Sequence, residues 1–318
     1  MYASDPAPVS RVPTVSGAVP SLTDDPLLSA VGRTPLLALQ RVVEPGSGFE
    51  LWAKAEFRNP TGSVKDRAAL EIVRLALRDG SLRPGRTLID ASSGNSAVAY
   101  SLLGARLGFA VEVCLPRNVS PDRLERIRRF GAAVVLTDPL EGTDGAQREA
   151  RRRARAEPER YFYADQYNNP ANPGAHYRTT GPEIWAQTSG RITHLVAGVG
   201  TGGTISGTGR YLKEQRAAIS VIGVEPDGPL HGLEGLKHLP SAARPSTYDP
   251  RVVDATLRIP TEDAQAMQQR LAAEEGLTVG SSSAAAVLGA IQVGRVHPGS
   301  VVVTILPDAG HQRSASPA

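Results

Sequence analysis

The sequence has little of several residue types, and each shortage excludes a class of protein. Its single cysteine, Cys114, excludes an intramolecular disulfide framework, and its place in an apolar run predicts a buried structural thiol. No apolar run approaches the roughly 18 residues of a membrane span, so we expect no membrane partner. The net charge of +3 is too small to indicate a nucleic-acid partner. With 318 residues, 41% of them hydrophobic, the chain can bury the cores of about two domains.

Lysine is also scarce, so a reaction that needs a lysine amine has four candidates. These are Lys54, Lys65, Lys213 and Lys237; the other basic residues are arginines. Lys65 follows NPTGSV and begins a predicted amphipathic helix, where positive potential and partial desolvation would lower the pKa of its amine. A Schiff-base lysine needs that shift. Lys54 lies in a strand of the same neighbourhood, whereas Lys213 and Lys237 look peripheral.

Short β-rich runs alternate with helical runs along most of the chain. We expect strands over residues 50–57, 86–92, 111–116, 133–138, 194–200, 220–226 and 300–308. We expect helices over residues 63–80, 95–108, 121–131, 204–215, 261–276 and 282–296. This alternation predicts an α/β fold with buried, mostly parallel sheets. The arginine-rich segment 148–160 has no interleaved aromatic residues and is typical of a solvated helix face.

Residues 1–25 have no hydrophobic period and are interpreted as a flexible tail. They lack the charged start and apolar stretch of a signal peptide, so we expect a cytoplasmic protein. Regular structure is expected to begin with a helix that has Asp25 as its N-cap and Pro26 at its first position. The NNPANPG stretch at 168–174 is interpreted as the passage between two lobes.

Three Gly- and Ser-rich loops each join a strand to a helix start: residues 60–65, 92–96 and 198–204. Such loops offer free N–H groups to a ligand. The third, GVGTGGT, matches the dinucleotide fingerprint G-x-G-x-x-G, with Glu225 at the end of the next strand, which keeps an NAD-binding oxidoreductase as one alternative. The loop also carries the hydroxyls of Thr201 and Thr204, which suit a phosphate monoester. A phosphate cup together with an activated Lys65 indicates pyridoxal 5′-phosphate.

The motifs of the whole chain then resemble one family. They are VGRTPL, NPTGSVKDR, SSGNS, DQYNNPANPGAHYRTTGPEIW, GVGTGGTISGTGR and EEGLTVGSSSA. Together they resemble the cysteine synthase branch (O-acetylserine sulfhydrylases) of the fold-type-II pyridoxal-phosphate enzymes, the tryptophan synthase β superfamily, and the fourth motif looks most like the B-type enzymes. The resemblance implies two lobes with twisted, mostly parallel sheets flanked by helices. Residues 26–56 and 168–318 would form a larger cofactor-binding lobe, and residues 57–167 a smaller mobile lobe that closes on the substrate. A homodimer is also implied.

The resemblance also implies roles for individual residues. The cofactor-binding residues would be Lys65, Asn95, Gly200, Thr201, Gly202, Gly203, Thr204 and Ser282. The substrate-binding residues would be Ser92, Ser93, Asn95, Ser96, Gln166, Lys237 and His238. Lys65 would form the internal aldimine and move the α-proton. A serine hydroxyl, Ser282, leaves the pyridine nitrogen neutral, which favours β-elimination over transamination. The implied reaction is β-replacement on an activated L-serine through an α-aminoacrylate, with sulfide or another sulfur nucleophile, giving L-cysteine or an analogue.

The sequence departs from the family pattern at several places. Ala97 and Ala284 replace glycines, and the C-terminus lacks a Tyr-Leu-Ser-Thr segment. These departures keep a second alternative, a cofactor-binding relative without catalysis that acts as a partner or scaffold. Glu225-Pro226-Asp227 has no arginine for a phosphate leaving group, which favours O-acetylserine over O-phosphoserine. Lys237 and His238 stand where B-type relatives place a basic pair that admits thiosulfate; alternatively, both are solvated helix residues.

Overall fold

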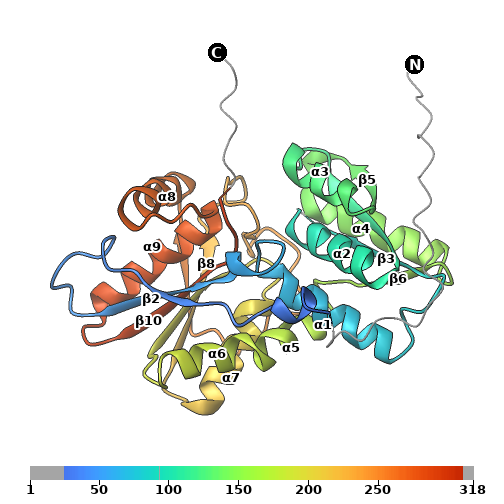
Figure 1. The fold of residues 1–318 in the computed structure, drawn as a ribbon. Helices are drawn as coiled ribbons and strands as arrows, with labels where there is room; N and C mark the ends of the chain where they lie inside the picture. The colour runs from blue at the N-terminus through green and yellow to red at the C-terminus, as the bar shows by residue number, and fades with distance from the viewer. Residues whose placement is uncertain (1–24, 93, 311–318) are drawn as a thin grey trace. The chain divides into compact units, whose positions relative to one another are not determined.

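Two β-sheets organise the chain. The computed structural model describes residues 25–92 and 94–310, and its strands form one six-stranded and one four-stranded sheet (Figure 1). The larger sheet has the order β1 (Leu36–Ala38), β2 (Glu50–Ala55), β10 (Val301–Leu306), β7 (His194–Gly198), β8 (Ser220–Pro226) and β9 (Ala255–Ile259). The smaller has the order β5 (Ala133–Thr137), β4 (Ala110–Pro116), β3 (Thr87–Ala91) and β6 (Tyr161–Tyr163). Apart from the antiparallel β1–β2 pair, the neighbouring strands are parallel, which confirms the predicted architecture.

Helices connect the strands. They are α1 (Lys65–Arg78), α2 (Asn95–Leu107), α3 (Pro121–Arg129), α4 (Gly142–Ala156), α5 (Ala171–Arg178), α6 (Thr180–Gln187), α7 (Gly203–Gln215), α8 (Thr261–Glu275) and α9 (Ser281–Val296). Glycine ends two of them, because Gly108 after α2 and Gly276 after α8 both adopt the left-handed conformation that closes a helix. Among the described residues, no helix is both long and apolar enough to cross a membrane.

Helices cover both faces of the larger sheet. On one face α9 packs against the sheet and α8 packs on α9; on the other lie α5, α6 and α7 (Figure 1). The central strand β10 is buried along its whole length and alternates between two cores. Val302 and Leu306 belong to the core under α9, and Val303 and Ile305 to the core on the opposite face. This two-sided burial explains the continuous apolar run of this strand.

The chain divides into two compact units. One contains Asp25 and residues 76–164 with the smaller sheet; the other contains residues 26–75 and 165–310 with the larger sheet. The expected lobe of residues 57–167 differs from this division at its start, because residues 57–75 pack within the larger unit. The N–H of Val64, for example, donates to the carbonyl of Pro307 at 2.8 Å. The exact bounds of a mobile lobe stay a prediction.

The structure corrects two local expectations, at Asp25 and at residues 168–174, and agrees with the one for Cys114. Asp25 is not a helix N-cap: a 3-10 turn spans Leu28–Ala30, and the Asp25 carboxylate instead pairs with Arg106 at 2.7 Å. The segment 168–174 is not only a connection, because α5 begins within it. Cys114 is fully buried, and burial raises the pKa of its thiol to about 12, as expected for a structural cysteine. The predicted tail was residues 1–25, and its residues 1–24 lie outside the described residues.

The arginine-rich segment 148–160 behaves as a solvated helix face. Most of it lies in α4, where Arg152 and Arg153 both bind the carboxylate of Glu149 at 2.8 and 2.7 Å. Arg153 also reaches Glu112 on β4 at 3.2 Å. Arg152 and Arg153 are therefore paired with carboxylates of the same unit, which favours the solvated helix face over a site for an external anion.

Candidate active site

The loop between β7 and α7 forms a cradle of backbone N–H groups. Gly202 has φ +82°, and Gly203 begins the helix. A Cβ atom on Gly200 would lie 2.2 Å from the carbonyl oxygen of Gly235, and one on Gly203 would lie 2.0 Å from Oδ1 of Asn172. Close packing behind the loop thus requires these glycines, and a loop at a helix N-terminus can offer N–H groups to an anion.

Side chains from distant segments fix this loop. The amide Nδ2 of Asn172 donates to Thr201 Oγ1 at 3.0 Å and to the carbonyl of Gln166 at 2.8 Å. The hydroxyl of Thr247 donates to the carbonyl of Thr201 at 2.6 Å. Gln166 and Asn172 are 3% and 2% exposed. The structure therefore places two predicted site residues, Thr201 and Gln166, beside one another through Asn172, which sequence reasoning missed.

Thr204 has a partner that the sequence analysis also missed. His176 of α5 is 1% exposed, and its Nε2 lies 3.2 Å from Thr204 Oγ1. Its Nδ1 lies 2.8 Å from the hydroxyl of Thr180 at the start of α6. Burial, with a smaller effect of the Arg67 charge, lowers the pKa of His176 to about 3, so the imidazole is neutral.

Hydrogen bonds fix the loop before Lys65 at several residues. Asn59 donates to Glu56 Oε2 at 2.8 Å, and the N–H of Thr61 donates to Asp66 Oδ2 at 2.7 Å. The N–H of Lys65 lies 3.3 Å from Ser63 Oγ. Lys65 begins α1 as predicted and is half-buried. The NPTGSVK motif therefore fixes the position of its backbone before any ligand binds.

A buried cluster of four charges lies behind this loop. Arg67 binds Glu56 and Glu183, each at 2.7 Å, and Lys54 binds Glu183 at 2.7 Å. Thr34, from VGRTPL, donates to Glu56 at 2.7 Å. Burial alone would raise the pKa of Glu183, but the hydrogen bonds and charges of Arg67 and Lys54 lower it to about 2. Two positive and two negative charges compensate each other, as buried ions require.

The other three lysines have different surroundings from Lys65. Lys54 is fully buried and bonded to Glu183, and Lys213 pairs with Asp254 at 2.6 Å. Lys237 is not peripheral as expected. It is 8% exposed, and its N–H donates to the carbonyl of Val199 at 2.8 Å, directly before the 200–204 loop.

Ser282 lies in the first turn of α9 and is 4% exposed. Its hydroxyl has no hydrogen-bond partner among the described residues, so it is available to a ligand. The neighbouring Ser283 instead donates to the carbonyl of Asp308 at 3.3 Å.

Three loops meet at one edge of the larger sheet. The 200–204 loop leaves the carboxyl end of β7, and Asp308 follows the carboxyl end of the adjacent strand β10. Asp308 forms a bridge with Ser63, and its carbonyl accepts the N–H of Gly280 at 3.2 Å. The Lys65 loop and the start of α9 are thereby attached to the same strand end, where ligands bind in parallel α/β sheets.

The SSGNS motif begins α2 in the smaller unit. Ser92 Oγ accepts the N–H groups of Gly94 and Ala97 at 2.9 and 3.2 Å, so its lone pairs are used and its proton remains available. Asn95 is the first residue of α2, and Ser96 is 4% exposed. Ser93 lies outside the described residues.

Lys237, His238 and Glu225 are the residues on which the expected choice of nucleophile and leaving group depends. Neither Lys237 nor His238 lies in a helix, so the alternative of two solvated helix residues is wrong. The Lys237 ammonium lies 5.3 Å from the centre of the Tyr167 ring, and His238 Nδ1 lies 2.8 Å from Ser241 Oγ. Burial raises the pKa of Glu225, which borders a cavity of about 700 Å³.

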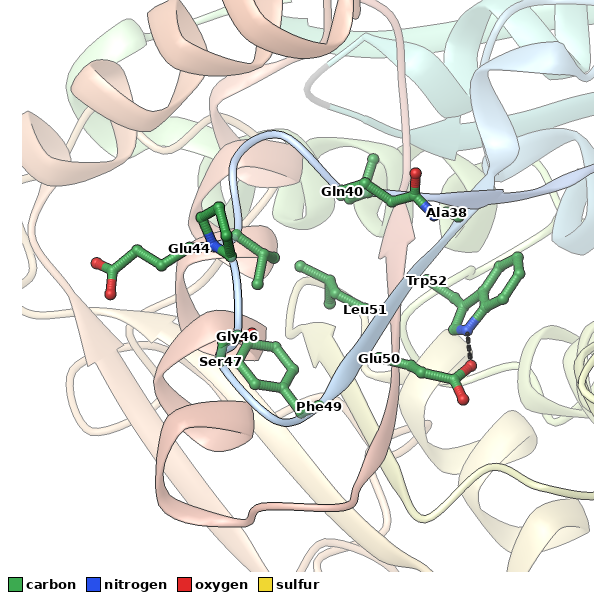
Figure 2. A pocket seen from close by; sticks show the side chains of 12 residues that line it. Ala38, Gln40, Glu44, Gly46, Ser47, Phe49, Glu50, Leu51 and Trp52 are labelled. Atoms are coloured by element: carbon green, nitrogen blue, oxygen red, sulfur yellow. Dashed lines mark hydrogen bonds between the residues drawn. The ribbon is translucent and has the colours of Figure 1, made fainter.

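A second pocket of about 330 Å³ lies in the β1–β2 hairpin (Figure 2). Phe49 and Leu51 form part of its wall, and Trp52 donates to Glu50 at 3.0 Å. None of the predicted site residues lines it. The described residues also contain no cluster of His, Cys, Asp and Glu that could hold a metal ion.

Comparison with known proteins agrees with the site. The family model described as pyridoxal-phosphate dependent enzyme matches residues 27–308. A cysteine synthase of Aquifex aeolicus (strain VF5) is 48% identical over 90% of this chain and 89% of its own. Cysteine synthase B of Salmonella typhimurium is 42% identical over 89% and 92%. The crystal structure of O-acetyl serine sulfhydrylase isoform 3 from Entamoeba histolytica superposes with a TM-score of 0.85, at 32% identity over 95% and 93%.

The chain therefore belongs to the pyridoxal-phosphate-dependent enzymes, with the fold-type-II architecture. Within them it falls in the cysteine synthase branch. The NAD-binding interpretation of GVGTGGT is thereby replaced. The residues fit the cofactor: a glycine cradle with two threonine hydroxyls suits its phosphate, and the unpartnered hydroxyl of Ser282 suits a neutral ring nitrogen.

Proposed function

We propose that this protein is a cysteine synthase that replaces the Cβ substituent of an activated L-serine with sulfide, giving L-cysteine. The observation that carries the proposal is the attachment of the Lys65 loop, the 200–204 loop and the start of α9 to the ends of two adjacent strands. Similarity to cysteine synthases over about 90% of the chain supports the same conclusion.

In this proposal Lys65 holds the cofactor and moves the proton at the substrate Cα. When bound, pyridoxal phosphate supplies the electron sink that makes this proton acidic and lets the Cβ substituent leave. Lys54 cannot replace Lys65, because its ammonium is fully buried and bonded to Glu183. The loop Gly200–Thr204 holds the phosphate through its N–H groups and hydroxyls.

Ser282 meets the pyridine nitrogen in our proposal and sets the type of reaction. Its hydroxyl cannot keep that nitrogen protonated as a carboxylate would, so loss of the Cβ substituent is favoured over transamination. The substrate carboxylate is held by Asn95, Gln166 and the serines of the SSGNS motif. The hydroxyl proton that Ser92 retains after capping α2 is suited to this anion.

We propose O-acetylserine as the preferred donor. At the end of β8 the structure has the buried carboxyl of Glu225 and, just after the strand, the exposed carboxylate of Asp227, with no arginine between them. A dianionic phosphate leaving group would be repelled there. Steady-state kinetics with sulfide test this: a higher kcat/KM for O-acetylserine supports it, and a higher kcat/KM for O-phosphoserine overturns it.

The proposal also includes the organisation of the enzyme. We infer a cytoplasmic homodimer, whose smaller lobe closes when substrate binds and brings the 92–96 loop to the cofactor. Sedimentation at micromolar protein would give the mass of two chains, and a single-chain mass would contradict it. A crystal soaked with a substrate analogue should show movement of residues 92–96, and an unmoved loop would count against closure.

A further inference from the structure

A buried imidazole stands behind the proposed phosphate cradle. His176 has no route to solvent, being 1% exposed, and contacts two threonine hydroxyls. Thr180 is itself fully buried, and His176 is the only partner of its hydroxyl among the described residues. Thr204 is half-buried, so its oxygen has room for a second partner on its other side.

The number of protons limits the arrangements to two. A neutral imidazole carries one N–H and one bare nitrogen, and each threonine hydroxyl has one proton. If the proton sits on Nδ1, His176 donates to Thr180 and accepts the hydroxyl proton of Thr204. Thr204 then presents only lone pairs to its other side. If the proton sits on Nε2, Thr180 donates to Nδ1, Nε2 donates to Thr204, and the Thr204 proton is free to point outward.

We infer that His176 is a positioning residue that holds the Nε2–H tautomer and directs the hydroxyl proton of Thr204 toward the cofactor phosphate. This inference rests on the proposed function, in which the 200–204 loop binds that phosphate. Lone pairs facing a phosphate dianion would repel it, whereas a donated O–H gives a charge-assisted hydrogen bond. The Nε2–H tautomer also satisfies the buried Thr180 hydroxyl, because with the proton on Nδ1 the Thr180 proton would have no acceptor among the described residues.

The surroundings keep the imidazole neutral. Burial is the main cause of the lowered pKa of His176; the charges of Arg67 and Lys65 lower it further, and Glu56 and Glu183 partly offset them. A buried neutral imidazole that is held in one tautomer donates a hydrogen bond from one nitrogen only. His176 therefore sets the orientation of Thr204 before the phosphate arrives, which lowers the ordering cost of binding.

The direct test is the position of the proton. In the pyridoxal-phosphate-loaded protein with ¹⁵N-labelled histidine, a ¹⁵N–¹H correlation spectrum should show the His176 proton on Nε2. The spectrum of His176→Asn assigns the signal among the six histidines of the chain. A proton on Nδ1 would overturn the inference even if every variant failed to fold, because this measurement needs only the natural protein and general assignment methods.

Two variants test the consequence for the cofactor. His176→Gln places an amide near the Nε2 position, where it can donate to Thr204, whereas the shorter His176→Asn keeps only the contact to Thr180. Pyridoxal phosphate should dissociate about 10- to 100-fold more readily from the Asn variant, the effect of one hydrogen bond to a charged group. The Gln variant should lie closer to the natural protein.

The ³¹P resonance of the bound cofactor gives a readout that a purely structural role would not move. It should shift in His176→Asn and return toward the natural value in His176→Gln. Equal affinity and an unchanged ³¹P shift in the Asn variant would overturn the inference alone. If the natural protein bound no pyridoxal phosphate, the proposed function would fail as well, so the two failures are distinguishable.

Discussion

Replacing Gly203 by alanine places a methyl group where the side chain of Asn172 now lies. The new Cβ would be 2.0 Å from Oδ1, 2.5 Å from Cγ and 2.9 Å from Nδ2 of Asn172, and these three atoms are its nearest neighbours. Alanine at a helix start is intrinsically favoured over glycine by at most about 1 kcal/mol. Overpacking costs about 1–3 kcal/mol, and displacing Asn172 also breaks its bonds to Thr201 and Gln166. The clash therefore outweighs the propensity gain, and Gly203→Ala should destabilise the protein.

A double-mutant cycle isolates this clash. Asn172→Ala alone should cost about 1–3 kcal/mol, because it removes two hydrogen bonds of about 0.5–1.5 kcal/mol each. In the double variant the Gly203→Ala methyl group enters the space that Asn172 vacates. The combined loss should then be smaller than the sum of the single losses by about 1–3 kcal/mol. Urea unfolding of the cofactor-free protein measures each value without interference from ligand binding.

The control is Gly228→Ala, because no atom lies within 4 Å of a Cβ atom at Gly228. This variant should unfold within about 0.5 kcal/mol of the natural protein. Additive losses in the cycle, or a Gly203→Ala variant as stable as the control, would refute the packing argument. In the holoenzyme Gly203→Ala should also weaken the binding of pyridoxal phosphate, because the displaced Asn172 no longer fixes Thr201.

The remaining predictions concern the chemistry. Borohydride reduction of the holoenzyme followed by peptide mapping should label Lys65; a label on another lysine would end the assignment. Because the folded-state pKa of Glu183 is about 2, below its ordinary 4.5, its contribution to stability is present above pH 4.5 and lost as the pH falls toward 2. Glu183→Gln should flatten that slope in urea unfolding, and an unchanged slope would contradict it. Ser282→Asp should slow β-replacement by about 10²–10³ and Ser282→Ala less; natural turnover in the Asp variant would exclude the ring-nitrogen role. Joint replacement of Lys237 and His238 by alanine should reduce thiosulfate use relative to sulfide, and equal use would refute their anion-admitting role.

Much of the fold followed from the periodicity of the sequence. Strand β10 and helix α9 were predicted because long apolar patterns leave few other structures. The three-residue strands β1 and β6 were missed, since their pairing depends on neighbours far along the chain. Helices α5 and α6 were hidden by proline, asparagine and glycine. Their prolines, Pro173 and Pro182, lie in the first turn, where no N–H bond within the helix is lost.

In the site, too, features with a local sequence pattern were predicted, and features that depend on distant residues were missed. The glycines and threonines at 200–204 were predicted because they form a recognisable local motif, although the packing that requires Gly200 and Gly203 is against Gly235 and Asn172. His176, Asn172 and Thr247 were missed, because each acts on that loop from 28 to 46 residues away and has no local signal. Lys237 was placed at the periphery for the same reason: only the folded chain shows that its segment returns to Val199.

The central claim is that this chain replaces a Cβ substituent by sulfur, and a half-reaction tests it most directly. The pyridoxal-phosphate-loaded protein is mixed with O-acetylserine alone, and sulfide is added in a second step, with both products followed by mass spectrometry. We expect release of one acetate per active site in the first step and formation of an equal amount of L-cysteine in the second. Retention of the cofactor without acetate release or cysteine formation would contradict the proposal and identify a relative that binds the cofactor without catalysing this reaction.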